Sequence, residues 1–264
     1  MNVPNLKAQV RLALLDCNVP KERSGIYTEL PLEVYRKKAA ELAQMREIRL
    51  SVFKPESEGR MPDLKGFDAL VIPDSSYTPT REFMERGELG RMLPAFINNV
   101  IESGKLALCI CFGMEAVAAS FGSYPASHLE EGTGKVFNLG YGTVRLEPSA
   151  LGDPIFSEYQ DQTKAIFAHR YFVQRLPDGA TALAKTILVP IAAFRMGSLY
   201  CVQWQPDLDI GLLVKSAEQH RGKLAGRAAY EPMLNPYNIE SRYRPEYDVQ
   251  NAQALDLFLR KIIE

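Results

Sequence analysis

One short stretch of the chain carries the residue best suited to covalent chemistry. Residues 106–110 are an apolar run, and Cys111 follows them directly. Such a run predicts a buried parallel strand, and the residues after Gly113 predict a helix. A cysteine at this turn has its sulfur near a helix N-terminus, which favours the thiolate and lowers the thiol pKa. Cys111 is therefore a candidate nucleophile, and a buried packing thiol at a strand–helix junction is the alternative.

The elements that must position this turn alternate between strands and helices. Apolar runs predict strands at residues 10–17, 68–73 and 106–110, and alternating residues predict a strand at 48–53. Helical spacing of apolar residues predicts one helix over 32–42 and a second that begins at Pro94 and ends at Gly104. This alternation is typical of a doubly wound, mostly parallel α/β sheet. Ligands of such sheets bind at the carboxyl ends of strands, where Asp74, Ser75 and Cys111 lie.

The pattern of predicted secondary structure changes in the second half of the chain. It predicts short strands at 136–137, 142–146, 165–172, 180–185, 190–195 and 200–204, some of them in a small antiparallel extension. Residues 209–250 combine prolines, tyrosines and arginines and are interpreted as an ordered insertion. An amphipathic helix from Leu255 to Ile263 follows. We expect one domain over residues 1–264.

Composition excludes several classes of partner. The net charge is -1, which gives no reason to expect nucleic acid or an anionic membrane as a partner. The cysteines lack metal-ligand spacing, so we expect no metal or cofactor and a reducing compartment. No signal peptide or membrane span is predicted, and the cytoplasm is the expected location. Cys17, Cys109 and Cys201 are interpreted as packing thiols, and Trp204 as a core residue beneath the site.

Several segments, in order, resemble motifs of the class I (triad) glutamine amidotransferases. Residues 109–115 resemble the family's G-x-C-x-G-x-Q nucleophile turn, and 138–146 resemble its E-x-G-W-G segment. Residues 169–179 resemble H-x-x-x-V…L-P-x-G, and 202–207 resemble V-Q-F-H-P-E. The resemblance implies a flavodoxin-like fold. It also implies that Cys111 is the nucleophile that attacks the side-chain amide of glutamine.

The proton-transfer residues of this family differ here. Gln205 stands where the family motif has histidine, and Asp207 stands where it has glutamate. Glutamine has no usable pKa near neutrality and is neither a general base nor a general acid. Loss of a general base costs on the order of 10²–10⁴ in rate. An efficient ordinary glutaminase is therefore not expected.

The residues expected around the substrate differ too. The family's P-G-G turn is Pro73-Asp74-Ser75, which places a carboxylate where an oxyanion would develop. Glu115 replaces a glutamine of the motif, and Asn138 replaces a glutamate. With Cys111, Gln205 and Asp207 as the catalytic set, the resemblance assigns a substrate-binding set: Asp74, Ser75, Phe112, Gly113, Glu115, Asn138, His169, Arg170 and Tyr171.

Three histidines are the remaining candidates for proton transfer. His169 lies within one of the motifs, where either a proton-transfer role or a structural, ligand-positioning role fits. His128 lies in a loop and is expected to face solvent. His220 lies in the insertion, which would bring it to the site if that segment folds over the pocket as a lid.

Two classes of function remain open at this stage. One is a cysteine-dependent enzyme that acts on the acyl or amide group of a glutamine-like or γ-glutamyl-like small molecule. The other is a catalytically silent pseudo-glutaminase that binds a ligand or scaffolds a separate synthetase or acceptor protein. Redox sensing by the cysteine is a third, less favoured role.

Overall fold

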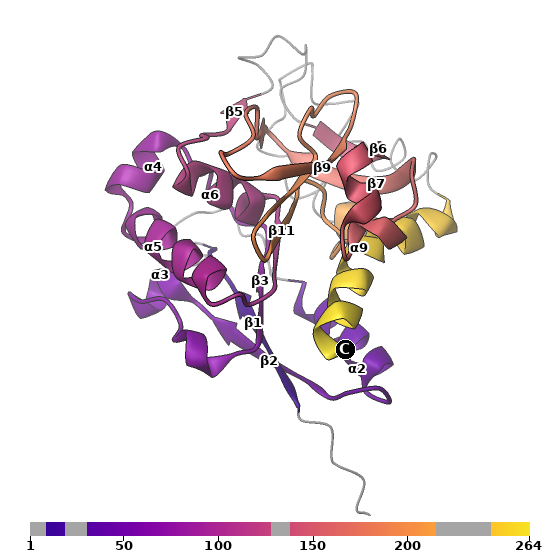
Figure 1. Ribbon diagram of the computed structural model, residues 1–264, viewed down its shortest axis with the longest axis horizontal. Helices are drawn as coiled ribbons and strands as arrows, with labels where there is room; N and C mark the ends of the chain where they lie inside the picture. Colours follow the sequence, from indigo (N-terminus) through magenta and orange to yellow (C-terminus); the bar gives the residue numbers. More distant parts are fainter. Residues whose placement is uncertain (1–8, 19–30, 128–137, 215–243) are drawn as a thin grey trace, which may run out of the picture.

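The computed structural model describes residues 9–18, 31–127, 138–214 and 244–264. Its centre is a nine-stranded mixed sheet in the order β2-β1-β3-β4-β11-β10-β9-β6-β7 (Figure 1). The parallel part consists of β2 (Ile48–Phe53), β1 (Val10–Leu15), β3 (Ala69–Ile72), β4 (Ala107–Ile110) and β11 (Leu199–Val202). The antiparallel part consists of β10 (Ala193–Met196), β9 (Thr181–Lys185), β6 (Asn138–Leu146) and β7 (Thr163–His169). A separate pair joins β5 (Ala126–Ser127) to β8 (Tyr171–Phe172).

Helices cover both faces of the parallel part and create two apolar cores. One face carries α2 (Leu32–Leu42) and α9 (Pro245–Ile263), and the other carries α3 (Pro55–Glu58), α4 (Arg81–Arg86), α5 (Glu88–Glu102) and α6 (Phe112–Ser120) (Figure 1). Short 3₁₀ turns are η1 (Leu64–Gly66), η2 (Pro148–Gly152) and η3 (Phe156–Glu158). Alternate residues of β1 enter opposite cores, Leu12 with α9 and Ala13 with α5 and α6. The predicted doubly wound fold with an antiparallel extension is confirmed.

The predicted helix start at Pro94 is wrong. Residues 81–86 form α4, and α5 begins at Glu88 and continues through Pro94. A proline inside a helix costs about 3 kcal/mol because it removes a hydrogen bond and crowds the preceding turn. Here the helix offsets that cost by burying one apolar face, which consists of Leu89, Leu93, Phe96, Ile97 and Val100. Gly104 ends the helix with a φ of 67°, as predicted.

Two boundaries in the second half also differ from the predictions. β6 is one continuous strand from Asn138, where a strand from Gly142 was expected, and the predicted strand at 136–137 lies outside the described residues. α9 begins at Pro245, inside the range predicted for the insertion. Proline fits the first turn of a helix, where no N–H is needed, and Glu246 and Asp248 complement the helix dipole there.

Strand register brings three segments together at the carboxyl edge of the sheet. Ile72 of β3 pairs with Cys109 of β4, and Val202 of β11 pairs with Ile110. Since the three strands are parallel neighbours, the residues that follow them emerge side by side. Asp74 and Gln203 therefore flank Cys111, one from each side.

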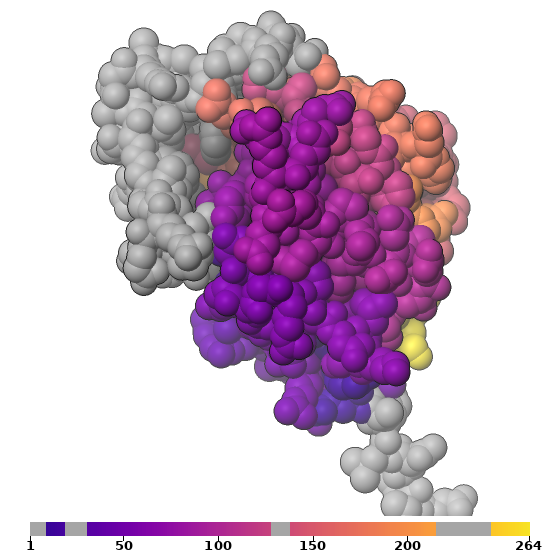
Figure 2. Space-filling view, turned by 90° about the vertical axis from the view of Figure 1, so that its left-hand side faces the viewer, coloured from indigo at the N-terminus to yellow at the C-terminus, as the bar shows by residue number. Residues whose placement is uncertain are grey.

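Two surface hollows lie away from this edge. One, of about 270 Å³, is lined at the amino ends of the strands by residues that include Val10, Asp68 and Leu106. The other, of about 500 Å³, lies between α2 and α9. Seen from the side, residues of the first half of the chain form most of one broad face (Figure 2). Among the described helices, none is long and apolar enough to cross a membrane.

Candidate functional site

Cys111 occupies a strained turn between β4 and α6. Its backbone has φ 49° and ψ -102°, a conformation that L-residues with a side chain rarely adopt. Strain of this kind persists only where the surroundings fix it, and it is common at functional sites. Gly113 makes the tight turn feasible, because a Cβ there would lie 2.2 Å from the backbone oxygen of Ile72. The Cys111 side chain is buried, with 4% of the residue exposed.

The carboxylate of Asp74 is the centre of the site. Its Oδ1 accepts the backbone N–H of Phe112 at 3.3 Å, and it also accepts the backbone N–H of Ser75. Its Oδ2 accepts Nε2–H of Gln205 at 2.6 Å, and the Cys111 thiol bonds to the same carboxylate. Both backbone donors that could hold a developing oxyanion are therefore directed at a carboxylate of the protein itself.

The expected lowering of the Cys111 pKa is wrong. Burial raises the pKa of the thiol well above its ordinary value, and the nearby carboxylates of Asp74 and Glu115 raise it further. The hydrogen bond from the Phe112 N–H acts in the opposite direction but is the smaller effect. A cysteine in this setting holds its proton, so the end of helix α6 does not generate a thiolate nucleophile at neutral pH.

Gln203 and Glu115 form the other side of the site. Nε2 of Gln203 donates to Oε1 of Glu115 at 3.1 Å and lies 3.7 Å from the Cys111 sulfur. Burial is the main reason that the pKa of Glu115 rises to about 8, and the charge of Asp74 adds to it. Glu115 is 4% exposed and Gln203 is 0% exposed. A neutral carboxylic acid is therefore the stable form of Glu115 at pH 7.

The backbone of Gln205 is fixed by hydrogen bonds on both of its polar groups. Its N–H donates to the oxygen of Ile166, and its oxygen accepts Nδ2–H of Asn251 at 2.7 Å. Asn251 is 0% exposed and comes from α9, so the C-terminal helix fixes the Gln205 turn. The side-chain amide can orient the Asp74 carboxylate but transfers no proton.

Asp207 points toward a different helix. Its Oδ2 accepts the hydroxyl of Tyr35 in α2 at 2.8 Å, and within the described residues this is its side-chain partner. Burial raises the pKa of Asp207 to about 6. The structure therefore places Gln205 in contact with Asp74 and Asp207 in contact with Tyr35, and does not join the two as consecutive members of a relay.

His169 and Asn138 pair with each other. Nδ1 of His169 lies 2.7 Å from the carbonyl oxygen of Tyr171, which only accepts, so this nitrogen carries the proton. Nε2 then accepts the Asn138 amide at 3.1 Å. Both ring nitrogens of His169 are therefore engaged in hydrogen bonds. Arg170 is exposed and stacks over the ring of Tyr171 at 5.4 Å.

The remaining predictions have mixed outcomes. Ser75 is buried, and its hydroxyl donates to the carbonyl oxygen of Cys17 at 3.0 Å. Cys17, Cys109 and Cys201 are fully buried, as predicted, and Cys109 enters the opposite core from Cys111. Trp204 is a fully buried core residue. His128, His220 and most of the proposed insertion lie outside the described residues.

Three residues that contact the candidate site were missed from the sequence. Gln203 was quoted within a motif but not singled out, although a glutamine between Val202 and Trp204 is a polar residue in an apolar strand. Tyr35 was assigned to the apolar face of a helix. Asn251 comes directly after the segment, residues 209–250, that was interpreted as an insertion. Tyr35 and Asn251 are far from Cys111 in the sequence and come close to the site only when the chain folds.

Comparison with known proteins identifies the family. The family model for class-I glutamine amidotransferases matches residues 34–212. The chain is 28% identical over 120 residues to GMP synthase (glutamine-hydrolyzing) of Streptomyces avermitilis, which is 44% of this chain and 21% of that protein. It is 27% identical over 154 residues to GMP synthase (glutamine-hydrolyzing) of Pyrobaculum aerophilum, which is 58% of this chain and 26% of that protein.

A solved glutamine amidotransferase from Thermotoga maritima has the same fold, with a TM-score of 0.72 and 16% identity. That alignment covers 97% of this chain and 98% of the other. The chain belongs to the class-I glutamine amidotransferase family, as the motifs indicated. It spans about a quarter of the length of the curated relatives that it matches.

Proposed function

We propose that this protein is a glutamine amidotransferase-like protein whose Cys111 site does not hydrolyse glutamine in the ordinary way. In this proposal it is a pseudo-glutaminase that binds a small ligand and a partner protein. The observation that carries the proposal is the hydrogen bond from the Phe112 N–H to the Asp74 carboxylate. A tetrahedral intermediate needs that donor, and removing one such donor typically costs about 10²–10³ in rate.

The proton-transfer machinery supports the same conclusion. Gln205 stands at the place of the family's histidine, and its side chain donates to Asp74 instead of accepting a thiol proton. Asp207 is bonded to Tyr35, and Cys111 retains its proton. A nucleophile without a base, beside a carboxylate in the donor pocket, lacks both requirements of acyl transfer.

The partner in this proposal is a separate synthetase or acceptor protein. The relatives that the chain matches are named GMP synthase (glutamine-hydrolyzing), and each is several times longer than the matched segment. We propose that this chain corresponds to the amidotransferase part of such an assembly. Its small-molecule ligand would then be glutamine-like or a relative with a similar charge pattern.

A set of glutaminase assays tests the proposal. We expect no glutamine hydrolysis by the unaltered protein beyond that of Cys111→Ala. Gln205→His alone should add little, because Asp74 still accepts the Phe112 N–H. Combining Asp74→Gly, Gln205→His and Asp207→Glu should raise hydrolysis by about 10²-fold or more. The same triple variant with Cys111→Ala is the matched control and should be inactive.

Two outcomes would count against the proposal. Cys111-dependent glutamine hydrolysis by the unaltered protein would contradict it directly. A full gain from Gln205→His alone would show that Asp74 does not obstruct the donor pocket.

Cysteine-dependent chemistry on an unusual substrate is a second candidate. The strained backbone of Cys111, with φ 49°, is the observation that favours it, because a purely structural residue at this turn would not need that conformation. Intact-mass measurement after incubation with γ-glutamyl amides tests this candidate. A covalent adduct that disappears in Cys111→Ser would support it, and the absence of any adduct would count against it.

A further inference from the structure

A hollow on the outer face of α2 and α9 takes no part in the Cys111 site. Its volume is about 500 Å³, and its walls are α2, the segment around η3 and the C-terminal half of α9, which lies beside α2 (Figure 1). Its floor is apolar, because Leu42, Ile155 and Leu257 line it and pack with the core beneath. A hollow of this volume falls in the range that proteins use for binding.

The walls of the hollow are held together by the chain itself. Lys38 of α2 pairs with Asp256 of α9 at 2.8 Å. On the other side, Nε2 of Gln253 in α9 donates to the backbone oxygen of Glu158 in η3 at 3.0 Å. The three walls therefore keep their positions without an occupant. A preformed surface loses little conformational entropy when a partner binds to it.

Exposed apolar side chains belong to the same elements. Met45 is exposed on the rim of the hollow, and Leu151 is exposed in η2, shortly before Pro154 of the rim. Val249 is exposed on α9. Among the residues that the structure describes, Ile187 is the other large apolar side chain that is exposed. Single exposed apolar residues are common, but several of them around one hollow indicate a contact with another protein.

The charged side chains that line the hollow are, with two exceptions, paired within the chain. The paired set consists of Lys38, Glu41, Asp256, Lys261 and Glu264. The exceptions are Arg260 of α9 and Glu158 of η3, which are exposed and have no ion pair within the described residues. They carry opposite charges and lie on different walls. The lining therefore favours a partner surface that presents one charge of each sign beside an apolar residue.

The same face of a second copy presents these groups. In a contact across a twofold axis, a residue i of one copy meets residue j of the other, and j meets i. Arg260 of each copy can then meet Glu158 of the other, so both unpaired charges are neutralised twice. The exposed Met45 supplies the apolar side chain that the floor of the hollow requires.

We propose that the face around this hollow is the contact between two copies of the chain in a symmetric dimer. The contact lies away from the carboxyl edge of the sheet, and α2 and α9 reach that edge through Tyr35 and Asn251. Dimer formation would therefore leave the edge beside Cys111 free for a different protein. The inference is independent of the proposed function.

Sedimentation velocity over a wide concentration series tests the inference. The unaltered protein should form a species of twice the mass of the chain. Arg260→Glu places two acids opposite each other and should weaken dimer formation by about tenfold or more, and Glu158→Arg should do the same with two bases. The double variant exchanges the two charges and should restore the dimer. Only a direct contact between the two residues predicts that restoration.

Arg86→Glu is the matched control. It makes the same change of charge at an exposed residue of α4, on the other face of the sheet, and should leave the dimer unchanged. A monomer at every concentration would overturn the proposal and leave the face to a different protein. A dimer that Arg260→Glu leaves intact, or one that the double variant does not restore, would also overturn it. None of these outcomes depends on the glutaminase assays, which measure hydrolysis and not association.

Discussion

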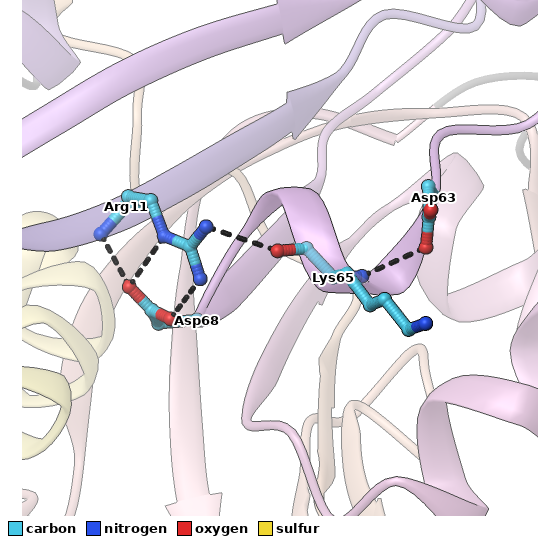
Figure 3. A network of polar contacts seen from close by, with 4 residues as sticks. All are labelled: Arg11, Asp63, Lys65 and Asp68. Carbon is cyan, nitrogen blue, oxygen red and sulfur yellow. Dashed lines mark hydrogen bonds and ion pairs between the residues drawn. The ribbon is translucent and has the colours of Figure 1, made fainter.

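Strand β3 has an aspartate just beyond each of its ends, and the two carboxylates have opposite surroundings. At the amino end, Asp68 accepts the backbone N–H and Nε–H of Arg11 and pairs with its Nη2 at 2.7 Å (Figure 3). This hydrogen-bonded pair lowers the pKa of Asp68 to about 2. At the carboxyl end, Asp74 has hydrogen-bond donors but no cation among the residues that the structure describes, and burial raises its pKa.

The comparison separates two uses of a carboxylate. Asp68 joins β1 to the start of β3 through an exposed ion pair with Arg11. Asp74 accepts the backbone N–H groups of Ser75 and Phe112 at the carboxyl edge of the sheet. One strand thus has an exposed, ion-paired acid at one end and a buried acid at the other, and within the described residues the buried one has no cation beside it.

The largest expected effect concerns the pH dependence of stability at the carboxyl end. The pKa of Glu115 is about 8 in the folded protein and near 4.5 when exposed, so the folded state holds a proton that the unfolded chain releases. Stability should therefore fall as the pH rises between these values, by up to about 1.4 kcal/mol per pH unit.

Glu115→Gln should flatten that fall and be more stable than the unaltered protein at the upper end of the range. Chemical denaturation at a series of pH values measures the free energy of unfolding of the variant and of the unaltered protein. Asp74 and Asp207, whose pKa values are also raised, should leave a residual slope. A slope that is the same in the variant would show that Glu115 ionises normally in the folded protein.

A smaller effect on the free energy of unfolding is expected from glycine substitutions near the two ends of β3. Gly113→Ala should destabilise the protein by about 3 kcal/mol, because the added Cβ would meet the backbone oxygen of Ile72 at 2.2 Å. Gly66→Ala, in η1 near the amino end of β3, is the matched control, since no atom lies within 4 Å of the added Cβ. Unfolding free energies measure both, and similar values for the two variants would contradict the tight packing of α6 on β3.

The smallest effect is expected at the amino end. Asp68→Asn should cost less than about 1 kcal/mol at neutral pH, because both partners of the ion pair are more than 40% exposed. The pKa of Asp68 is lowered, so its contribution is present above the unfolded pKa of 3.8 and disappears as the pH falls toward 2. High salt should reduce the difference. A cost of several kcal/mol that persists in high salt would contradict this interpretation.

Much of the fold could be predicted from local patterns. The apolar run at 106–110 lies almost where strand β4 is, because buried parallel strands consist of continuous apolar residues. The alternating residues 48–53 coincide with β2, which is only partly buried. Helix α5 could not be predicted correctly, because Pro94 indicates a helix start and only the burial of a whole apolar face explains its place inside the helix. Local propensity was overridden by packing.

Only part of the membership of the site could be predicted, and the pairing of its side chains could not. Cys111, Asp74 and Gln205 do meet, as the motifs indicated, since strand ends of a parallel sheet converge. The Tyr35 hydroxyl, which bonds Asp207, comes from a residue 172 positions away in sequence, and no local pattern reports such a contact. The sign of the Cys111 pKa shift depends on two acids and on burial, all of which require the three-dimensional arrangement.

The most direct test of the central claim is a pH titration of the Cys111 thiol by ultraviolet thiolate absorbance, taken as the difference between the unaltered protein and Cys111→Ser. Our account predicts no thiolate signal from Cys111 at neutral pH, and a lower thiol pKa in Asp74→Asn because a negative charge has been removed beside the sulfur. A thiolate already present at pH 7, or a pKa that Asp74→Asn leaves unchanged, would contradict the account.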